Sequence, residues 1–382
     1  MAETMTTSRM QAEAFDIERY LSDGVEDIIG NALKASLANP RETAFLLRYG
    51  AAAKKAARVR SRNHADGIPA PPFLIASITG DCNLSCKGCY ARSLNDAKGM
   101  DCGAAGNTDL ESVEWSRIFS EARDLGVSLM LLAGGEPMLR QDVIREASRY
   151  SEIIFPVFTN GTLIDQAYLA LFDQHRNLIP ILSIEGDEEQ TDTRRSAGIY
   201  ARVMAAMGEL SRRGILFGAS ITVTKENLAT VTGESFIDDL AQKGCRAIVY
   251  VEYIPVERRE LALDEGERRI LETRINAYRA PEYSRAVSNR KTGSRQKDLI
   301  LISFPGDEKA SQGCLAAGRG FFHINAAGGA EPCPFAPYSD TNFRTKSLRE
   351  VLDSPLFQKT AQFRRAHRGT RGGDAVCLGW GI

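Results

Sequence analysis

Three cysteines lie within eight residues of one another, in the stretch SITGDCNLSCKGCYAR that covers residues 77–92. They are Cys82, Cys86 and Cys89, and their spacing is C-x3-C-x2-C. Soft thiolates that are this close along a loop can converge on one metal centre. A structural zinc site needs four ligands and usually presents C-x2-C pairs, and nothing nearby supplies a second pair.

Two iron–sulfur interpretations remain open. An ordinary four-cysteine cluster needs another thiolate, and Cys102 in the loop NDAKGMDCGAAGN is the nearest candidate. In the other interpretation the cluster is one protein ligand short, so that one iron stays open for a substrate or cofactor, as in catalytic metal sites. The chain has 8 cysteines in 382 residues, too few for a disulfide scaffold, so clustered cysteines indicate metal binding or catalysis in a reducing compartment.

The cysteine loop directly follows an apolar segment, FLIASI, at residues 73–78. This is the first of six predicted strands, which alternate with amphipathic helices and indicate a parallel sheet buried on both faces. The other strands are predicted at 127–133, 153–158, 179–184, 216–223 and 247–254, and the helices at about 111–125, 139–150, 164–175, 191–213 and 234–243. The fold class is therefore α/β, as a partial (β/α)6 barrel of the TIM type, with its functional loops at the carboxyl ends of the strands.

Four segments are expected along the chain. Residues 1–66 form an N-terminal helical segment that is broken at Asn39-Pro40, and residues 67–257 form the barrel core. Residues 258–310 are a charged linker with a surface helix and a flexible loop, SNRKTGSRQK. Residues 311–382 form a small metal-stapled C-terminal domain. The basic run from Lys54 to Arg62 is interpreted as a solvated helix face rather than a phosphate site.

Charge and hydropathy exclude some classes of partner. The formal net charge is −1, so there is no basic field that would favour a nucleic acid partner. No apolar run approaches the roughly 20 residues that span a bilayer, and the N-terminus lacks the apolar core of a secretory signal. We therefore expect a cytoplasmic protein without a membrane span.

Polar groups recur where the predicted strands end. LLAGGEP, residues 131–137, follows the second strand, and its glycines allow the backbone to approach a ligand closely. Glu136 adds a carboxylate suited to a cationic amine. FTNGT (158–162) ends the third strand, and SIEG (183–186) ends the fourth and is followed by Arg194 and Arg195. Polar groups thus recur at the strand ends on one rim of the barrel.

The pairing of CNLSCKGCY with GGEP resembles the radical S-adenosylmethionine superfamily over roughly residues 73–255. The resemblance implies a [4Fe–4S] cluster on the three cysteines, with S-adenosylmethionine chelating the open iron. It also implies S-adenosylmethionine-binding residues: Gly134, Gly135 and Glu136 at the methionine amine, Ser183 and Arg195 (or Arg194) at the carboxylate or ribose, and Asn160 and Glu185 as weaker polar contacts.

One position departs from the family pattern. The family usually has an aromatic residue just before the third cysteine, and this chain has Gly88 there, with Tyr90 just after the cysteine. The aromatic wall over the adenine is therefore expected from Tyr90 or from elsewhere in the chain. Glu252 and Tyr253 close the sixth predicted strand, either as a proton donor or substrate contact or as ordinary polar residues at a strand end.

The C-terminal stretch CLAAGRGFFHINAAGGAEPC, from Cys314 to Cys333, resembles the opening of SPASM and twitch domains, which carry auxiliary iron–sulfur clusters. The resemblance implies a tight hairpin before Cys333 and one auxiliary cluster on Cys314, Cys333 and Cys377. The cysteine-rich middle of a full SPASM domain is missing. The fourth ligand is open between Cys245, another side chain and the substrate. The alternatives are buried structural cysteines, which is also the interpretation of Cys245, or zinc. His323 is interpreted as an internal polar residue of the hairpin.

The expected activity follows from the resemblance. The protein is expected to be an enzyme whose reduced cluster cleaves S-adenosylmethionine to a 5'-deoxyadenosyl radical that abstracts hydrogen from a substrate. The first candidate substrate is a peptide or protein, as for a maturase, and the alternative is a small molecule such as a sugar, lipid or cofactor precursor. A reductant such as flavodoxin or ferredoxin is expected as a partner. The competing hypothesis is a non-catalytic iron–sulfur electron carrier or scaffold.

Overall fold

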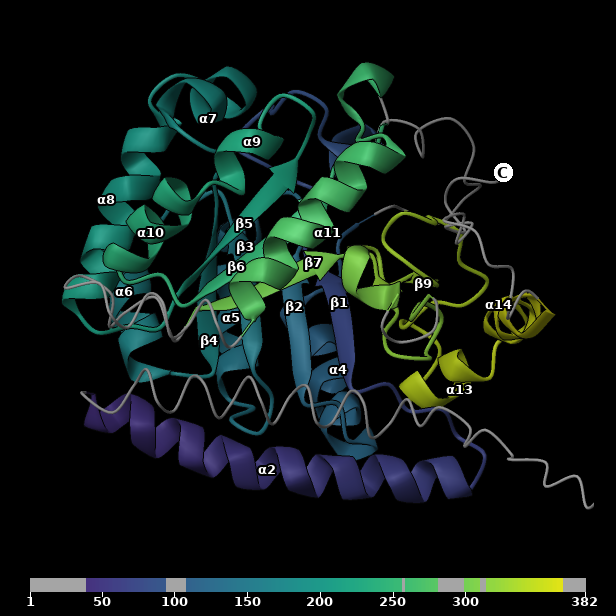
Figure 1. Ribbon diagram of the computed structural model, residues 1–382. Coiled ribbons are helices and arrows are strands. Elements are labelled where there is room, and N and C mark those ends of the chain that lie inside the picture. Colours follow the sequence, from purple (N-terminus) through teal and green to yellow (C-terminus); the bar gives the residue numbers. More distant parts are fainter. Residues whose placement is uncertain (1–38, 94–107, 256–257, 281–298, 310–313, 367–382) are drawn as a thin grey trace, which may run out of the picture.

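The structure is a computed structural model that describes residues 39–93, 108–255, 258–280, 299–309 and 314–366. Within these ranges, nine strands form one sheet in the order β7-β6-β5-β4-β3-β2-β1-β8-β9. Strands β1 to β7 are parallel: β1 (Phe73–Ser77), β2 (Leu129–Ala133), β3 (Phe155–Thr159), β4 (Leu178–Ser183), β5 (Gly218–Val223), β6 (Ala247–Glu252) and β7 (Ile300–Phe304). The sheet curls into a partial barrel, which confirms the predicted fold class (Figure 1).

Helices cover the outer face of this sheet (Figure 1). They are α4 (Ser112–Leu125), α5 (Gln141–Ser148), α6 (Gln166–Gln174), α7 (Glu188–Arg195), α8 (Ile199–Arg212), α9 (Leu228–Val231), α10 (Glu234–Gln242) and α11 (Glu265–Arg279). The single helix predicted over 191–213 is two helices. Ser196 and Gly198 have φ angles of 125° and 79°, which a continuing right-handed helix does not allow.

Alternation along the strands distinguishes the two faces of the sheet. In β1, Leu74 and Ala76 are fully buried beneath the helices, whereas Phe73, Ile75 and Ser77 are only partly buried. Because successive side chains of a strand point to opposite faces, the partly buried set lies on the concave face of the barrel. The same alternation recurs in β2 and β7. The concave face is therefore the wall of an interior that is not fully packed.

The seventh parallel strand, β7, differs from the expectation for residues 258–310. β7 pairs with β6 from Ala247↔Ile300 to Val251↔Phe304, so this part of the predicted linker belongs to the barrel wall. A five-residue apolar run between charged segments gave too weak a signal. The predicted surface helix is α11, and the loop SNRKTGSRQK lies outside the described residues.

Helix α2 (Pro40–Ala65) lies across the amino ends of the strands (Figure 1). It begins at the predicted break, where the side chain of Asn39 accepts hydrogen bonds from the first turn. The Tyr49 hydroxyl donates to the carbonyl of Ser128 at 2.8 Å, and Arg60 donates to the carbonyl of Gly126 at 2.6 Å. α2 thus closes the end of the barrel opposite the rim where the strands finish.

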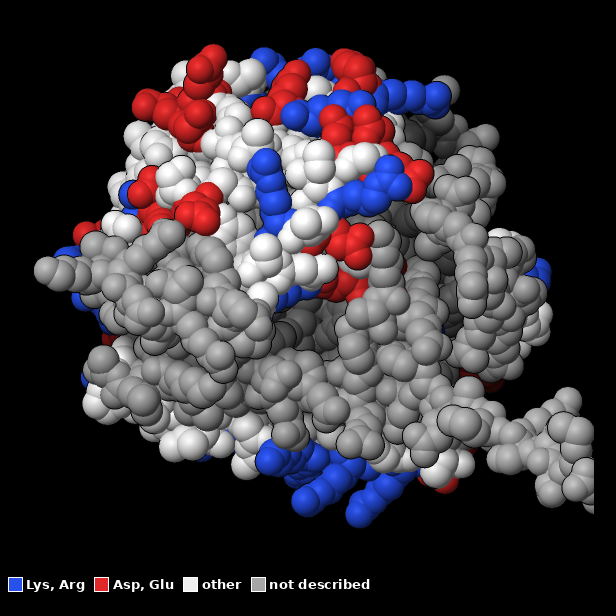
Figure 2. Space-filling view, viewed as in Figure 1, with Lys and Arg blue, Asp and Glu red and all other residues white. Residues whose placement is uncertain are grey.

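Basic side chains gather along the outer edge of α2, at the bottom of the space-filling view (Figure 2). The exposed arginines and lysines of α2 are Arg41, Arg48, Lys54, Lys55, Arg58 and Arg62. They lie at the amino end of the barrel, away from the cysteine loop. The other end, over α7, α9 and α11, carries intermingled acidic and basic side chains (Figure 2).

The C-terminal region adds a hairpin to the β1 edge of the sheet. Strand β8 (His323–Ile324) pairs in parallel with β1 and antiparallel with β9 (Ala330–Glu331). This is the hairpin predicted before Cys333. Helices α13 (Leu348–Leu352) and α14 (Pro355–Ala366) follow. No helix in the described ranges is long and apolar enough to cross a membrane.

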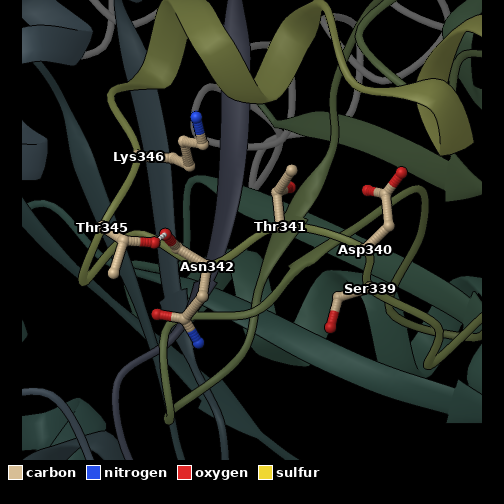
Figure 3. A pocket seen from close by; sticks show the side chains of 6 residues that line it. All are labelled: Ser339, Asp340, Thr341, Asn342, Thr345 and Lys346. Atoms are coloured by element: carbon tan, nitrogen blue, oxygen red, sulfur yellow. Dashed lines mark hydrogen bonds between the residues drawn. The ribbon is translucent and has the colours of Figure 1, made fainter.

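A polar hollow lies in the loop between β9 and α13 (Figure 3). Six side chains line it: Ser339, Asp340, Thr341, Asn342, Thr345 and Lys346. Two of these hold the local chain, because Asn342 donates to the carbonyl of Ala327 and Asp340 accepts from the backbone of Leu356. The hollow contains no thiol or imidazole, and we assign it a structural role.

Candidate active site

The three cysteines of the loop lie together at the carboxyl rim, directly after β1. Cys82 is exposed, and Cys86 and Cys89 are partly buried. Burial raises the pKa of the Cys82 thiol, and the neighbouring charges of Glu136, Cys86 and Cys89 raise it further. Since the charges of Cys86 and Cys89 both act on Cys82, the fold brings all three thiols into one site.

Three thiols of one loop can serve as ligands of a four-iron cluster. The thiolates around a four-iron cluster bind different irons, so they lie farther apart than the ligands of one ion. Burial raises the pKa of Cys86, while Arg195 and Arg194 lower it, so positive charge is available to balance an anionic cluster.

The glycines of the GGEP turn pack closely against the residues that lead into the cysteine loop. The backbone N–H of Gly135 donates to Thr79 O at 2.9 Å, and that of Glu136 donates to Asp81 O at 2.8 Å. A Cβ added to Gly135 would lie 2.0 Å from Asp81 O, and one added to Gly134 would lie 2.3 Å from Thr79 O. Only glycine allows the two rim segments to approach this closely.

Gly135→Ala is therefore expected to push the GGEP turn away from the cysteine loop. We expect a loss of about 2–4 kcal/mol in stability, because the overlap is with backbone and cannot be relieved by a rotamer change. S-Adenosylmethionine binding, measured by calorimetry on the reconstituted protein, should also be lost. Gly208→Ala is the matched control: Gly208 lies in α8 with nothing within 4 Å of an added Cβ. It should be stabilising by about 0.5–1 kcal/mol, and equal behaviour of the two variants would contradict the steric argument.

The carboxylate of Glu136 joins the rim of β2 to that of β3. It accepts hydrogen bonds from Thr159 Oγ1 at 2.7 Å, from the N–H of Asn160 at 2.8 Å and from the N–H of Met138 at 3.0 Å. Burial raises its pKa, and these donors lower it. A carboxylate has about four acceptor sites, so one remains for a further donor such as an amine.

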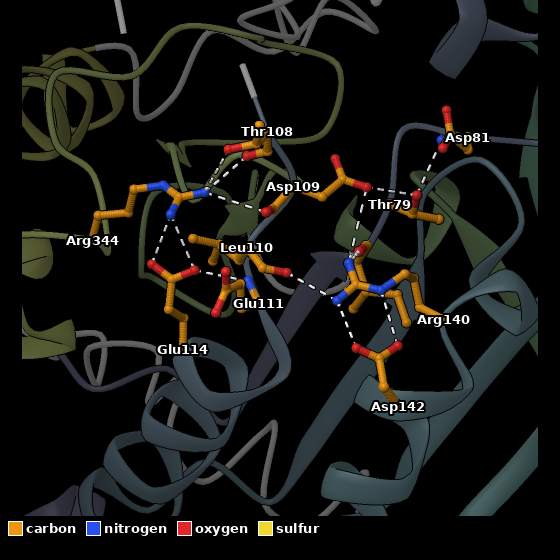
Figure 4. A network of polar contacts seen from close by, with 11 residues as sticks. Thr79, Asp81, Thr108, Asp109, Leu110, Glu111, Glu114, Arg140, Asp142 and Arg344 are labelled. Atoms are coloured by element: carbon orange, nitrogen blue, oxygen red, sulfur yellow. Dashed lines mark hydrogen bonds and ion pairs between the residues drawn. The ribbon is translucent and has the colours of Figure 1, made fainter. Parts of the chain in front are cut away.

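A polar network supports the same junction from below (Figure 4). Arg140 donates to the carbonyls of Ile78 at 3.3 Å and Leu110 at 3.0 Å, and it is held by Asp142 at 2.9 Å. The hydroxyl of Thr79 donates to Asp109 at 2.7 Å and accepts from the N–H of Asp81 at 3.1 Å. These contacts fix the backbone from which the cysteine loop departs. No sequence motif indicates this role of Arg140.

Asn160 connects the cysteine loop to the end of β3. Its side-chain amide donates to Asn83 Oδ1 at 2.8 Å, and Asn83 in turn donates to Thr162 Oγ1 at 2.8 Å. Asn83 lies next to Cys82, so this pair anchors the loop. The sequence predicts Asn160 as a polar contact to the cofactor. In the structure its side-chain amide binds Asn83 of the cysteine loop.

The predicted residues after β4 form a buried cluster of charge. Arg194 and Arg195 both pair with Glu185, and Arg195 Nη2 lies 2.6 Å from Glu185 Oε1. Burial disfavours the charge of Arg195, but Glu185 and then Cys86 raise its pKa. Glu185 Oε2 is buried and has no hydrogen-bond partner among the described residues. Ser183 ends β4 on the concave face, beside Ser220 of β5. An acceptor without a donor fits a hydroxyl-bearing ligand here.

The structure resolves where the aromatic side chains near Gly88 lie. A Cβ on Gly88 would meet the Tyr253 hydroxyl at 2.7 Å, and the residue has a φ of +64°. Tyr253, after β6, therefore occupies the space beside the position where the family has its own aromatic. Tyr90 turns instead toward the C-terminal region, edge-on to Phe335 with ring centroids 5.0 Å apart. From the sequence, Tyr253 is either a proton donor or substrate contact or an ordinary polar residue at a strand end, and its position beside Gly88 is not predicted.

Two of the three predicted auxiliary ligands lie in one apolar cluster with Tyr90. Cys333 is buried and Cys314 is partly buried in it. The turn after Cys314 lies beside Cys333, because the N–H of Ala317 donates to Pro332 O at 2.8 Å. Cys377 and Cys102 lie outside the described residues. Cys245 is fully buried before the amino end of β6, far along the strand from the rim, which confirms its interpretation as a core residue.

Part of the chain matches a known protein family, and curated proteins are similar to most of its length. Residues 76–232 match the model of the Radical SAM superfamily. The AdoMet-dependent heme synthase of Methanosarcina barkeri is 26% identical over 310 residues, which cover 76% of this chain and 84% of the relative. The PqqA peptide cyclase of Gluconobacter oxydans is 26% identical over 309 residues, covering 76% and 79%.

A solved structure shares the fold. Streptococcus suis SuiB bound to S-adenosylmethionine aligns with a TM-score of 0.60 at 19% sequence identity, covering 84% of this chain and 70% of that one. SuiB bound to its precursor peptide SuiA aligns with a TM-score of 0.61 at 18% identity, covering 85% and 72%.

Proposed function

Because this chain belongs to the radical SAM superfamily, with a [4Fe–4S] cluster and S-adenosylmethionine as its cofactors, we propose that it modifies a peptide substrate within the barrel. The cluster, when bound, supplies the electron that cleaves S-adenosylmethionine and so generates the radical that takes hydrogen from the substrate. One observation supports this proposal most strongly. Three thiols lie beside the GGEP turn, whose glycines have no room for a side chain.

In this proposal each of the predicted rim residues has its own role. Cys82, Cys86 and Cys89 hold the cluster. The GGEP turn presents backbone to the methionine amine, and Glu136 has one acceptor site left for it. Arg195 and Ser183 contact the carboxylate or ribose, and Glu185 offers its unpartnered oxygen to a hydroxyl. Asn160 acts by anchoring the loop, and Tyr90 packs the loop against the C-terminal region.

The C-terminal region, 311–382, serves as an auxiliary cluster domain in this proposal. Cys314 and Cys333 are neighbours in an apolar cluster beside Tyr90, which suits ligands of a second iron–sulfur centre close to the first. Cys377 is the further ligand. Of the proposed N-terminal segment 1–66, the described helix α2 closes the barrel, and the proposed barrel core of 67–257 is completed by β7 from the segment 258–310.

A peptide is the preferred substrate because a peptide cyclase is among the relatives that align along most of this chain. A second candidate is a small cofactor precursor. The similarity to a heme synthase, at the same identity and over the same share of this chain, favours it specifically. The concave face offers an interior wall in either case.

A fractionated extract can distinguish a peptide substrate from a small cofactor precursor before either substrate has been identified. An extract of the source organism is divided by ultrafiltration into peptide-sized and smaller fractions, and each is added to the reconstituted enzyme with dithionite and S-adenosylmethionine. We expect the peptide fraction to stimulate 5'-deoxyadenosine formation above the substrate-free rate, and proteinase treatment to abolish the stimulation. Stimulation only by the smaller, protease-resistant fraction would support the cofactor precursor and overturn the peptide. No 5'-deoxyadenosine under any condition would overturn the enzymatic proposal.

Two further parts of the proposal concern its setting. A protein reductant such as flavodoxin or ferredoxin supplies the electron. The cytoplasm is the proposed location, because the cluster thiolates must stay reduced and unpaired by disulfides.

A further inference from the structure

A buried chain of polar side chains connects β1 to the C-terminal hairpin and has no part in the function proposed above. His323 Nε2 lies 2.8 Å from the Ser77 hydroxyl, and His323 Nδ1 lies 2.7 Å from Glu331 Oε2. Asn325 donates to the other oxygen of Glu331 at 2.7 Å. The order is hydroxyl, imidazole, carboxylate, with an amide holding the carboxylate in place.

The position of this chain is set by the pairing of β8 with β1. His323 is the register partner of Ile75, so its side chain is on the same face as Ile75 and Ser77. That face is the concave wall of the barrel. His323 and Glu331 are 5% and 1% exposed, whereas Ser77 is only partly buried. The hydroxyl is therefore the end of the chain that reaches the barrel interior.

A merely structural hairpin does not require these groups. Burying an imidazole and a carboxylate beside apolar side chains is costly, and apolar residues of similar volume often serve stability as well. The apolar cluster of Tyr90, Phe335 and Phe321 adjoins this hairpin. A hydroxyl bonded to a histidine that is oriented by a carboxylate is instead the arrangement by which proteins move protons.

We propose that Ser77, His323 and Glu331 form a proton relay that serves the substrate in the barrel. The substrate gives a proton to Ser77 Oγ as the hydroxyl proton of Ser77 passes to His323 Nε2. A substrate X–H bond breaks, an Nε2–H bond forms, and the Ser77 O–H bond is renewed. The resulting imidazolium keeps its Nδ1–H on the carboxylate of Glu331. This proposal rests on the proposed function, because it takes the barrel interior as the substrate site.

The groups that surround the relay are consistent with this direction of transfer. Glu331 on β9 is the acidic group in contact with the ring, and Ser77 on β1 and Asn325 in the hairpin turn complete its polar contacts. Tyr90 and Cys333 are the next titratable groups. Burial raises the pKa of Tyr90, and the charges of Cys89, Cys333 and Glu331 raise it further, so the Tyr90 hydroxyl keeps its proton.

The first test reads the protonation of His323 directly and needs no substrate. The chain contains 4 histidines, so the imidazole nitrogens of the full-length holoenzyme, labelled with ¹⁵N-histidine, can be assigned with the variant His323→Gln. At about pH 8, where an ordinary histidine is neutral, we expect His323 to carry its proton on Nδ1 and to leave Nε2 bare. Ser77→Ala should shift the Nε2 resonance, and Ser77→Thr should keep it. A proton on Nε2 would overturn the relay, because that nitrogen could then accept nothing from Ser77.

The second test reads turnover, using the extract fraction that stimulates 5'-deoxyadenosine formation. Ser77→Ala and His323→Gln should lower the stimulated rate about 100-fold, the usual scale of acid–base catalysis, and Ser77→Thr should restore it. The substrate-free rate of S-adenosylmethionine cleavage should stay within about twofold of the parent protein. Equal stimulated rates in Ser77→Ala and the parent would overturn the relay. Absence of 5'-deoxyadenosine formation by the parent under every condition would instead count against the proposed function, and the nitrogen resonances would still decide the relay.

Discussion

Cys86→Ala is expected to reduce 5'-deoxyadenosine formation to the level of a protein-free blank. The cluster needs three protein thiolates, and with two left it has no stable seat beside the GGEP turn. Cys86 is the thiol whose pKa is raised by burial and lowered by the charges of Arg195 and Arg194. Its loss therefore also leaves these two arginines without the anionic cluster beside them. The measurement is anaerobic reconstitution, iron analysis and chromatography of the products after addition of dithionite and S-adenosylmethionine.

The matched control is Cys245→Ala, which removes an equally reduced cysteine from the core at the amino end of β6. It should keep both iron and activity, at a small cost in stability for the thiol that donates to Ala247 O at 3.1 Å. Formation of 5'-deoxyadenosine by Cys86→Ala above the blank would sink the assignment of the loop. In the parent protein, about eight iron atoms per chain would support an auxiliary cluster, and about four would exclude one.

The strands and the cysteine rim could be predicted because their signals are local. Six short apolar runs between amphipathic helices fix a parallel sheet, and the carboxyl ends of parallel strands meet at one rim. That rule alone brings Cys82, Glu136 and Glu185 together. The periodicity also placed the six predicted strands to within a few residues, as for β4, predicted at 179–184 and found at Leu178–Ser183.

The parts that were missed depend on contacts between distant segments. β7 became recognisable only from its pairing with β6, because five apolar residues between charged loops do not distinguish a barrel strand from a linker. His323 was read as an internal hairpin residue, which its burial confirms. Its partner Ser77 lies 246 residues away, and nothing in the sequence indicates that β8 pairs with β1.

The absence of a side chain at Gly88 is explained by the position of Tyr253. The sequence left the aromatic of the cysteine loop unassigned, with Tyr90 as one candidate. In the structure Tyr90 packs on Phe335, and Tyr253 fills the space beside Gly88. A side chain at position 88 and the present position of Tyr253 exclude each other, because an added Cβ would lie 2.7 Å from the Tyr253 hydroxyl. The loop can therefore lack its own aromatic without leaving a void.

Glu136→Ala is expected to damage stability and cofactor binding together. The substitution strands three donors at the rim: Thr159 Oγ1, the N–H of Asn160 and the N–H of Met138. A buried donor without an acceptor costs about 1–3 kcal/mol, so the expected loss is about 3–5 kcal/mol, allowing for water that enters the space. Thermal unfolding of the apoprotein should shift downward by roughly 6 °C or more. Calorimetry on the reconstituted protein should detect no S-adenosylmethionine binding, because the same hydrogen bonds hold the GGEP turn in place at the end of β3.

Two further variants separate the role of this carboxylate from a general effect of charge. Glu136→Gln keeps one acceptor oxygen for Thr159 and Met138 but turns its amide N–H₂ toward the N–H of Asn160. It should therefore lose about 1–2 kcal/mol, between the parent and Glu136→Ala. Glu152→Ala removes an exposed glutamate just before β3 and should leave the unfolding temperature and the binding unchanged. Equal stability of Glu136→Ala and Glu152→Ala would mean that the hydrogen bonds at Glu136 do not hold the rim. A stable Glu136→Ala that had lost only binding would make the carboxylate a ligand for the amine rather than the clamp between β2 and β3.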